Sequence, residues 1–393
     1  MAFSARSILR TRPALWRDVR VLRVVAQIAF VVLLYYAAKP LVENLQAGLE
    51  RLKVESGFDF LRQTAGFPIG EGLPYEPTDS YAYAFWVGIV NTLRVLFVAI
   101  PLATVLGVLA GIARLSSNWL ISHMAGAYVE TIRNVPLLLQ LFFWAALLAS
   151  LPRVREATEL PGPTYLTNRG IYFPGSTPSS GFNFWLLAIG LGLILALAVF
   201  IMRTRYQERT GRPGYSVWLA SGVFALFVLG GWFLAPERPL TPDMPALQGL
   251  NFKGGFSVTA QFATIVIGLV VYTGAFIAEV VRAGILAVPK GQTEAALAVG
   301  LKRSMVLRLV VLPQALRVII PPLTNQYLNL AKNSSLGVAI GYPELFSVGG
   351  TILNQSGQAV EMISLIMLTY LMMSLITSLI TNAYNRRVQF VER

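Results

Sequence analysis

Long apolar segments recur along the chain and are separated by shorter polar stretches. A helix needs about 20 apolar residues to cross the roughly 30 Å hydrocarbon core of a bilayer, and eight segments have about that length or more. The pattern therefore predicts an all-α polytopic membrane protein with about eight transmembrane helices. Pro321, Pro322 and Asn325 interrupt the seventh segment. The predicted spans are residues 21–38, 83–112, 124–150, 184–202, 216–235, 259–287, 312–331 and 358–383.

The composition agrees with a membrane protein, because 55% of the 393 residues are hydrophobic and 13% are charged. Soluble domains are roughly one-quarter charged. The formal net charge is +13, but the basic residues form short clusters between apolar segments, so we expect no nucleic-acid partner. The chain has no cysteine, and its single histidine, His123, argues against a histidine-built metal site. We expect no bound metal.

The N-terminal 38 residues combine a basic start with an apolar run, VVAQIAFVVLLYYAA, which is also the pattern of a cleaved signal peptide. A cut after Ala38 would place the bulky Tyr36 where a small residue is preferred, and Lys39 and Pro40 follow directly. We therefore favour an uncleaved first span, with cleavage as the alternative. Residues 1–82 would then comprise a cytoplasmic tail, this helix and an outer loop.

The distribution of charge orients the spans. With the N-terminus inside, the inner segments hold 19 Lys and Arg against 4 Asp and Glu, whereas the outer segments hold 9 against 11. Cytoplasmic loops carry an excess of Lys and Arg, so this orientation is favoured, and it also places the C-terminal tail, residues 386–393, inside. The outer loops 39–82 and 152–182 are rich in Pro, Gly and Ser, and we expect lids or docking ledges there without an independent domain.

One polar stretch, PKGQTEAALAVGLKRSMVLRLVVLP, interrupts the hydrophobic sequence between the sixth and seventh spans. On the topology above, residues 288–312 lie at the cytoplasmic base of the membrane. As a helix, TEAALAVGL places Ala296 and Gly300 on one narrow face, where another protein can come close, and Gly300 permits a bend before a second, basic helix. Such a helix pair fits the socket of a cytosolic partner. The alternative is an amphipathic connector on lipid headgroups, which Lys302 and Arg303 would suit.

The residues of this stretch also resemble a known family. Glu294-Ala295-Ala296, then Gly300, then Val311-Leu312-Pro313 are similar to the EAA loop in the membrane subunits of bacterial ABC importers. Longer stretches resemble the polar amino acid permeases of the histidine, glutamine and arginine uptake type. They are YVETIRNVPLLLQLFFW at 128–144, YTGAFIAEVVRAGILAVPKGQTEAALAVGL at 272–301 and VLPQALRVIIPPLTNQYLNLAKNSSL at 311–336.

The resemblance implies a type I ABC importer permease core of five helices within residues 83–385. This chain differs from that core by its N-terminal helix and by a helix pair inserted at 184–235. Such enlargement resembles the general L-amino-acid importers, in which two unequal permease subunits pair. We therefore favour a heterodimer over a pair of identical chains.

By the same resemblance, a dimer of ATP-binding subunits would grip the EAA loop, a second related permease would complete the passage, and a periplasmic amino-acid-binding protein would deliver the solute to the bacterial inner membrane. The chain has no Gly-x-x-x-x-Gly-Lys-Ser/Thr phosphate loop, so the partner ATPase would bind ATP and Mg, and this chain would bind no cofactor. It also lacks His-Glu-x-x-His and Gly-x-Ser-x-Gly, so we expect no enzyme. The implied ATPase-coupling residues are Glu294, Ala295, Ala296, Gly300, Leu301 and Pro313.

Polar residues at membrane depth are candidates for the substrate pathway, because an amino acid zwitterion needs partners for its ammonium and its carboxylate. For Glu279 the alternative is an i, i+3 ion pair with Arg282, and Glu130 has the same spacing to Arg133. The segment 329–345 is either a broken helix that lines a cavity or a loop between the last two spans. The candidate pathway residues are Glu279, Glu130, Arg133, Asn333, Ser334 and Ser335.

A secondary amino acid transporter driven by a proton or sodium gradient is the main alternative function. Its carboxylates would carry protons, and it would need no ATP-binding partner. The helix pair at the cytoplasmic base of the membrane favours the ATP-driven importer.

Overall fold

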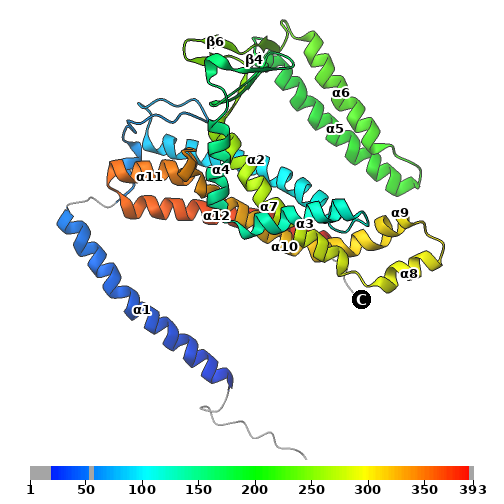
Figure 1. Cartoon of the computed structure of the whole chain (residues 1–393), viewed down its shortest axis with the longest axis horizontal. Helices are drawn as coiled ribbons and strands as arrows, with labels where there is room; N and C mark the ends of the chain where they lie inside the picture. Colours follow the sequence, from blue (N-terminus) through cyan, green and yellow to red (C-terminus); the bar gives the residue numbers. More distant parts are fainter. Residues whose placement is uncertain (1–18, 53–56, 389–393) are drawn as a thin grey trace, which may run out of the picture.

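The computed structural model describes residues 19–52 and 57–388 as a helical protein with short strands in two of its connections (Figure 1). Seven of the described helices are long and apolar enough to cross a membrane, and the bent pair α3–α4 raises the number to eight, as the hydrophobic pattern predicts. The α-helices are α1 (Val19–Leu52), α2 (Tyr81–Ala113), α3 (Trp119–Asn134), α4 (Leu137–Ala149), α5 (Phe182–Thr210), α6 (Ser216–Leu234), α7 (Ala260–Leu286), α8 (Lys290–Ala298), α9 (Arg303–Val306), α10 (Leu312–Asn333), α11 (Leu345–Ser356) and α12 (Ala359–Val388).

The third predicted span is broken into two helices. α3 and α4 meet at an angle of 108° around Val135 and Pro136. A proline disfavours helical backbone at the residue before it, and Val135 is accordingly extended, with φ −104° and ψ 130°. Gln140 holds the bend, because its side chain donates to the carbonyl oxygens of Ile132 and Val135 at 2.9 and 3.0 Å.

The seventh predicted span is less interrupted than its prolines suggest. α10 continues through Pro321 and Pro322, and a short π-helical segment, Leu307–Val311, precedes it. Membrane helices tolerate internal proline where neighbouring helices compensate the lost hydrogen bond. Residues 329–345 were expected to form either a broken helix or a loop, and they contain both, since a 3₁₀ helix, Ser334–Ile340, follows α10 and a turn follows it. The turn leads into α11, a helix that the hydrophobic pattern did not predict.

Helix α7 forms the centre of the bundle. The apolar window of α7 is 61% buried, against 33% for α2, and α7 contacts α2, α3, α4 and α10. A Cβ added at Gly107 of α2 would lie 2.5 Å from the side chain of Ile277, and one at Gly111 would lie 2.7 Å from the carbonyl oxygen of Ala278. Two glycines four residues apart let the backbones of α2 and α7 approach closely, which is how membrane helices associate without a hydrophobic driving force.

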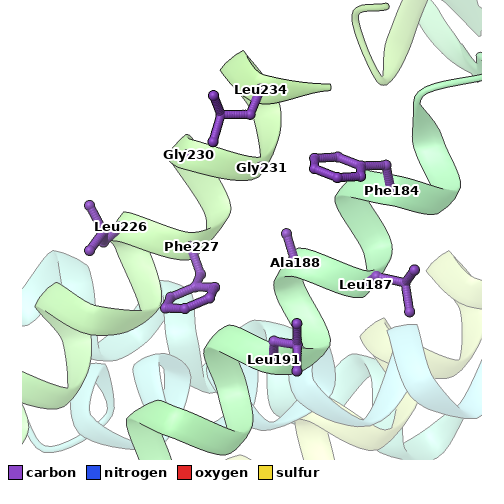
Figure 2. A pocket seen from close by; sticks show the side chains of 9 residues that line it. All are labelled: Phe184, Leu187, Ala188, Leu191, Leu226, Phe227, Gly230, Gly231 and Leu234. Atoms are coloured by element: carbon purple, nitrogen blue, oxygen red, sulfur yellow. The ribbon is translucent and has the colours of Figure 1, made fainter. Parts of the chain in front are cut away.

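The inserted helices α5 and α6 pack on each other and project away from this bundle (Figure 1). Between them lies a cleft of about 490 Å³ (Figure 2). Its lining offers only hydrocarbon and glycine, so the pair presents an apolar surface suited to lipid. The lining residues are Phe184, Leu187, Ala188, Leu191, Leu226, Phe227, Gly230, Gly231 and Leu234. All side chains of α1 from residue 22 to residue 40 are exposed, and most of them are apolar.

Short strands fill the connections α4–α5 and α6–α7, where we predicted only loops. β1, β2, β3 and β8 form an antiparallel sheet in that order, and β4–β5 and β6–β7 form separate pairs. Strands of three or four residues are too short to show an alternating pattern, so the sequence does not reveal them. They are β1 (Thr158–Leu160), β2 (Thr164–Thr167), β3 (Gly170–Phe173), β4 (Gly175–Pro178), β5 (Leu240–Asp243), β6 (Ala246–Gln248), β7 (Asn251–Lys253) and β8 (Phe256–Thr259).

The close approach of α2 and α7 makes a prediction about stability. We expect Gly107→Ala to lower the midpoint of unfolding in detergent, because the added methyl group meets Ile277 and overpacking costs about 1–3 kcal/mol. Gly126→Ala in α3 is the matched control, since no atom lies within 4 Å of the added carbon. Alanine is also favoured over glycine in a helix, so the control midpoint should stay or rise. Equal midpoints for the two variants would contradict the prediction.

Candidate functional site

The stretch between α7 and α10, residues 288–312, folds as the predicted pair of short helices. Pro289 precedes α8, and Gly300 ends it with a left-handed φ of +85°. The backbone N–H of Gly300 donates to Leu297 O at 2.9 Å, and that of Leu301 donates to Ala296 O at 3.2 Å. This pair of bonds is the Schellman motif that ends many helices at a glycine. Any other residue at position 300 would strain the turn.

This helix pair is fixed to the membrane helices by a small apolar cluster. Ala296 of α8, Val306 of α9 and Val311 are buried together and pack against Ile285 and Val288 at the end of α7. The cluster joins the pair to α7 on one side and to α10 on the other. A force applied to α8 is therefore passed to both helices through packed side chains.

The predicted coupling residues fall into two groups in this structure. Glu294, Ala295 and Gly300 are exposed and available to a partner. Ala296 is only 7% exposed, so it points into the apolar cluster and not, as we expected, onto the same outer face as Gly300. The remaining two residues, Leu301 and Pro313, are partly buried.

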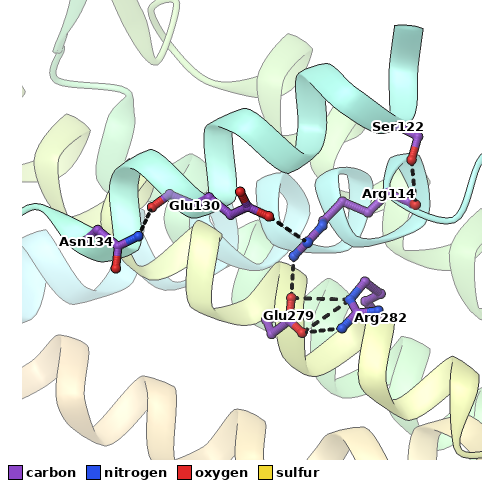
Figure 3. Close-up of polar contacts among 6 residues, drawn as sticks. All are labelled: Arg114, Ser122, Glu130, Asn134, Glu279 and Arg282. Carbon is purple, nitrogen blue, oxygen red and sulfur yellow. Dashed lines mark hydrogen bonds and ion pairs between the residues drawn. The ribbon is translucent and has the colours of Figure 1, made fainter. Parts of the chain in front are cut away.

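An ion-pair network joins the three helices α2, α3 and α7 (Figure 3). Arg114, which caps the C-terminus of α2, donates to Glu279 Oε2 of α7, and its Nη2 lies 3.6 Å from Glu130 Oε1 of α3. Arg282 donates from Nη2 to Glu279 Oε1 at 2.6 Å. Arg114 and Glu279 are only 16% and 26% exposed, whereas Glu130 is 73% exposed. The link between α2 and α7 is thus the sheltered part of the network.

Two of the acidic candidates, Glu279 and Glu130, belong to this network. Glu279 forms the i, i+3 pair with Arg282 and a second ion pair with Arg114, so both of its oxygens are bonded to protein. Glu130 pairs with Arg114 and not with Arg133. The guanidinium of Arg133 lies over the ring of Phe276, 5.1 Å from its centroid. A cavity of about 400 Å³ lies beside the network and is lined in part by Ser122, His123 and Gly126.

A second polar cavity, of about 310 Å³, lies between α7 and α10. Among the predicted pathway residues it includes Asn333, whereas the hydroxyls of Ser334 and Ser335 donate to carbonyl oxygens three residues earlier, at 2.7 and 2.8 Å. The sequence analysis missed the other lining residues. The spacing of Gln326 and Asn329 relative to Asn333 along one face of α10 could have revealed two of them. The cavity is lined by Tyr272, Thr273, Phe276, Gln326, Asn329 and Asn333.

Metal-ligating side chains do not cluster among the described residues. Within residues 19–52 and 57–388, no group of three or more metal-ligating side chains could hold an ion. The polar groups gather instead in cavities along α7 and α10. The arrangement is that of a polytopic helical membrane protein with a protruding helix pair at one end of its bundle.

Comparison with known proteins identifies the family. Residues 103–390 match the family described as binding-protein-dependent transport system inner membrane component. The general L-amino acid transport system permease protein AapQ of Rhizobium johnstonii is 46% identical, covering 93% of this chain and 92% of that protein. The putative amino-acid ABC transporter permease protein YhdX of Escherichia coli is 45% identical, covering 90% of each chain.

A third relative is the glutamate/glutamine/aspartate/asparagine transport system permease protein BztB of Rhodobacter capsulatus, which is 37% identical over 96% of each chain. This chain therefore belongs to the family of binding-protein-dependent transport system inner membrane components. That assignment confirms the family resemblance found in the sequence. Members of the family are transport permeases and not enzymes.

The ion-pair network predicts a coupling between two helices. We expect Glu279→Gln to destabilise the protein, because Arg114 and Arg282 would lose their shared carboxylate. A double-mutant cycle with Arg114→Gln should give an interaction energy of about 0.5–3 kcal/mol, measured by unfolding in mixed micelles.

Glu130→Gln serves as the control for this cycle. Its carboxylate is largely exposed, and such pairs contribute about 0–1 kcal/mol, so the change should leave stability nearly unaltered. Additive effects of Arg114→Gln and Glu279→Gln would show that the link between α2 and α7 has no energetic importance.

Proposed function

We propose that this chain is the permease subunit of an ATP-driven importer that moves L-amino acids from the periplasm to the cytoplasm. The three relatives described above, each matched over at least 90% of this chain, are named as amino acid permeases. The observation that carries the proposal is the helix pair at 288–312, which bears the EAA pattern and is packed onto α7 and α10. A dimer of separate ATP-binding subunits grips this pair and binds the ATP and Mg.

Coupling divides between an outer contact and an inner one. Glu294 and Ala295 meet the ATPase, because they are exposed on α8, and Gly300 sets the angle at which α8 is presented. Ala296 and Leu301, together with Pro313 at the start of α10, transmit the movement inward. Their support is the buried cluster that connects α8 to the ends of α7 and α10.

The remaining assembly follows from the same proposal. A second related permease lies against this chain, and a periplasmic amino-acid-binding protein docks on the side opposite to residues 288–312. The excess of Lys and Arg in the segments 1–23, 203–215 and 282–312 supports cytoplasmic N- and C-termini. Residues 1–82 and the inserted pair 184–235 are additions to the permease domain at 83–385, and the final eight residues form a cytoplasmic tail.

The amide side chains on α10 support a substrate pathway between α7 and α10. Gln326, Asn329 and Asn333 face one cavity, and among the described residues their side chains make no hydrogen bond to protein. Polar groups at membrane depth must meet water, solute or another protein chain. We therefore place the pathway here, with Asn333 as a lining residue. Arg133 borders it through its cation–π contact with Phe276, which lines the cavity. Glu279 and Glu130 lie in the neighbouring ion-pair network, and Ser334 and Ser335 shape the end of α10.

The coupling proposal is tested at Gly300. We expect Gly300→Ala to reduce amino acid uptake at least severalfold while the complex still hydrolyses ATP, because a left-handed φ costs an alanine about 1–2 kcal/mol and tilts α8 away from the ATPase. Glu294→Ala should have the same effect through loss of the contact itself. Uptake and ATP hydrolysis are measured together in proteoliposomes that contain the complete complex.

Two substitutions in the same helix are the controls. Gly291→Ala adds a methyl group in open space without a positive φ, and Gln292→Ala removes another exposed polar side chain. Both should leave uptake per ATP close to that of the unmodified complex. Normal uptake in Gly300→Ala and Glu294→Ala would remove the support for coupling through this pair.

The pathway proposal is tested on α10. Asn329→Leu and Asn333→Leu should each lower the maximal rate of uptake, because leucine removes the amide from the cavity and leaves the helix intact. Losing a hydrogen bond to a charged group corresponds to about a tenfold or larger change. Asn382→Leu on α12, far along the chain from the cavity, is the matched control. Equal rates in all three variants would place the pathway elsewhere.

A further inference from the structure

A third polar cavity lies at the opposite end of α7 from the helix pair at 288–312, which is called the coupling pair below. It has a volume of about 410 Å³ and is bounded by the loop before α2, by α2 itself and by strand β8. The cavity is at the N-terminal end of α7, and the coupling pair follows its C-terminal end. A helix of 27 residues separates these positions by about 40 Å. None of its lining residues lines either of the polar cavities described above, so it is a separate cavity.

Two opposite charges face this cavity without forming a close ion pair. Glu71 lines it from the loop and Arg94 lines it from α2. Within the described residues, no ion pair of 4.0 Å or less joins them; Arg94 lies over the ring of Phe262, 5.6 Å from its centroid, and acts on Glu71 only through its charge. Charges that serve only to hold a loop in place would be expected to meet. Here donors and an acceptor remain free on either side of the cavity.

The carboxylate of Glu71 is held in position by the start of α7. Thr259 donates from Oγ1 to Glu71 Oε2 at 2.6 Å, and the same hydroxyl accepts from the backbone N–H of Phe262 at 3.1 Å as the cap of α7. Glu71 Oε1 has no hydrogen bond to protein among the described residues. Burial raises the pKa of Glu71, and the bond from Thr259 and the charge of Arg94 oppose that rise. A cation bound next to Glu71 would compensate the cost of burying its charged carboxylate.

The loop around Glu71 is built to keep this geometry. The side chain of the fully buried Asn91 donates to Glu71 O at 3.1 Å and to Pro343 O at 2.9 Å. Gly72 has a φ of +111°, and a Cβ there would lie 2.3 Å from Asn91 Oδ1. Only glycine fits, so the loop is tied to α2 and to the turn before α11. A site whose groups are held before binding loses less entropy when the ligand arrives.

We infer that this cavity is a binding site for a free α-amino acid on its way into the permease, with Glu71 receiving the ammonium group and Arg94 receiving the carboxylate. The hydroxyl of Ser257 lines the same cavity and supplies a further hydrogen-bond partner. The inference rests on the proposed function for its substrate class. Because Thr259 links Glu71 to the cap of α7, the bound solute contacts the helix whose other end carries the coupling pair.

The test uses the complete complex in proteoliposomes, with ATP inside and the loaded binding protein outside. Radiolabelled L-amino acids are first screened with the unmodified complex, and the one taken up fastest becomes the probe. Glu71→Gln and Arg94→Gln should each lower its uptake about tenfold, the effect of losing one charge-assisted hydrogen bond. ATP hydrolysis stimulated by the binding protein should stay within about twofold of the unmodified complex, since such a factor corresponds to less than one hydrogen bond.

Charge-preserving variants and a control in the same loop that does not line the cavity complete the design. Arg94→Lys and Glu71→Asp should retain much of the uptake because they keep the charge. A folding defect would not depend on the charge in this way. Glu76→Gln in the same loop should behave as the unmodified protein. Normal uptake in Glu71→Gln and Arg94→Gln would overturn the inference. A parallel loss of stimulated ATP hydrolysis would also overturn it, because it would show that these residues are needed for the response to the binding protein. No uptake of any amino acid by the unmodified complex would instead reject the proposed function.

Discussion

The close contact between α2 and α7 is the constraint on which the rest of the structure depends. Gly107 and Gly111 bring the two backbones together, and Ile277 and Ala278 of α7 fill the space that their missing side chains leave. In a bilayer such packing replaces the hydrophobic effect as the force that joins helices. It holds α7 in the middle of the bundle, where α3, α4 and α10 also reach it.

Because α7 is central, the polar features of the protein are arranged along it. Its C-terminal end carries the coupling pair, and the ion pairs of Glu279 tie the same region to α2 and α3. The amide-lined cavity lies farther along its contact with α10, and the cavity of Glu71 and Arg94 lies at its N-terminal cap. A displacement of α8 therefore acts on a helix that borders each of these places. The arrangement suits a protein that passes force from one face of the membrane to the other.

The sequence predicted the spans and the pair of short helices within residues 288–312 well, because both depend on local signals. Apolar segments long enough to cross the bilayer predict the spans, and Gly300 after an alanine-rich segment predicts the end of a helix. It did not predict the short strands. The pairs β3–β8 and β4–β5 join the connections α4–α5 and α6–α7, which are far apart in the chain, and the other pairs are formed by strands of three or four residues within one connection. Nor did it predict that Glu130 would form its ion pair with Arg114 and not with Arg133. That pairing depends on how the end of α2 packs near α3. The inward direction of Ala296 was missed for the same reason, since a small residue is equally suited to an exposed contact and to a tight internal one.

The central claim is that ATP hydrolysis by separate subunits, acting through residues 288–312, drives amino acid movement through this chain. The most direct measurement is the accumulation of radiolabelled L-amino acids by proteoliposomes under two conditions. With the complete complex, binding protein and ATP but no ion gradient, the account predicts accumulation against the concentration gradient. Accumulation by this chain alone, with a proton or sodium gradient and no nucleotide, would contradict it.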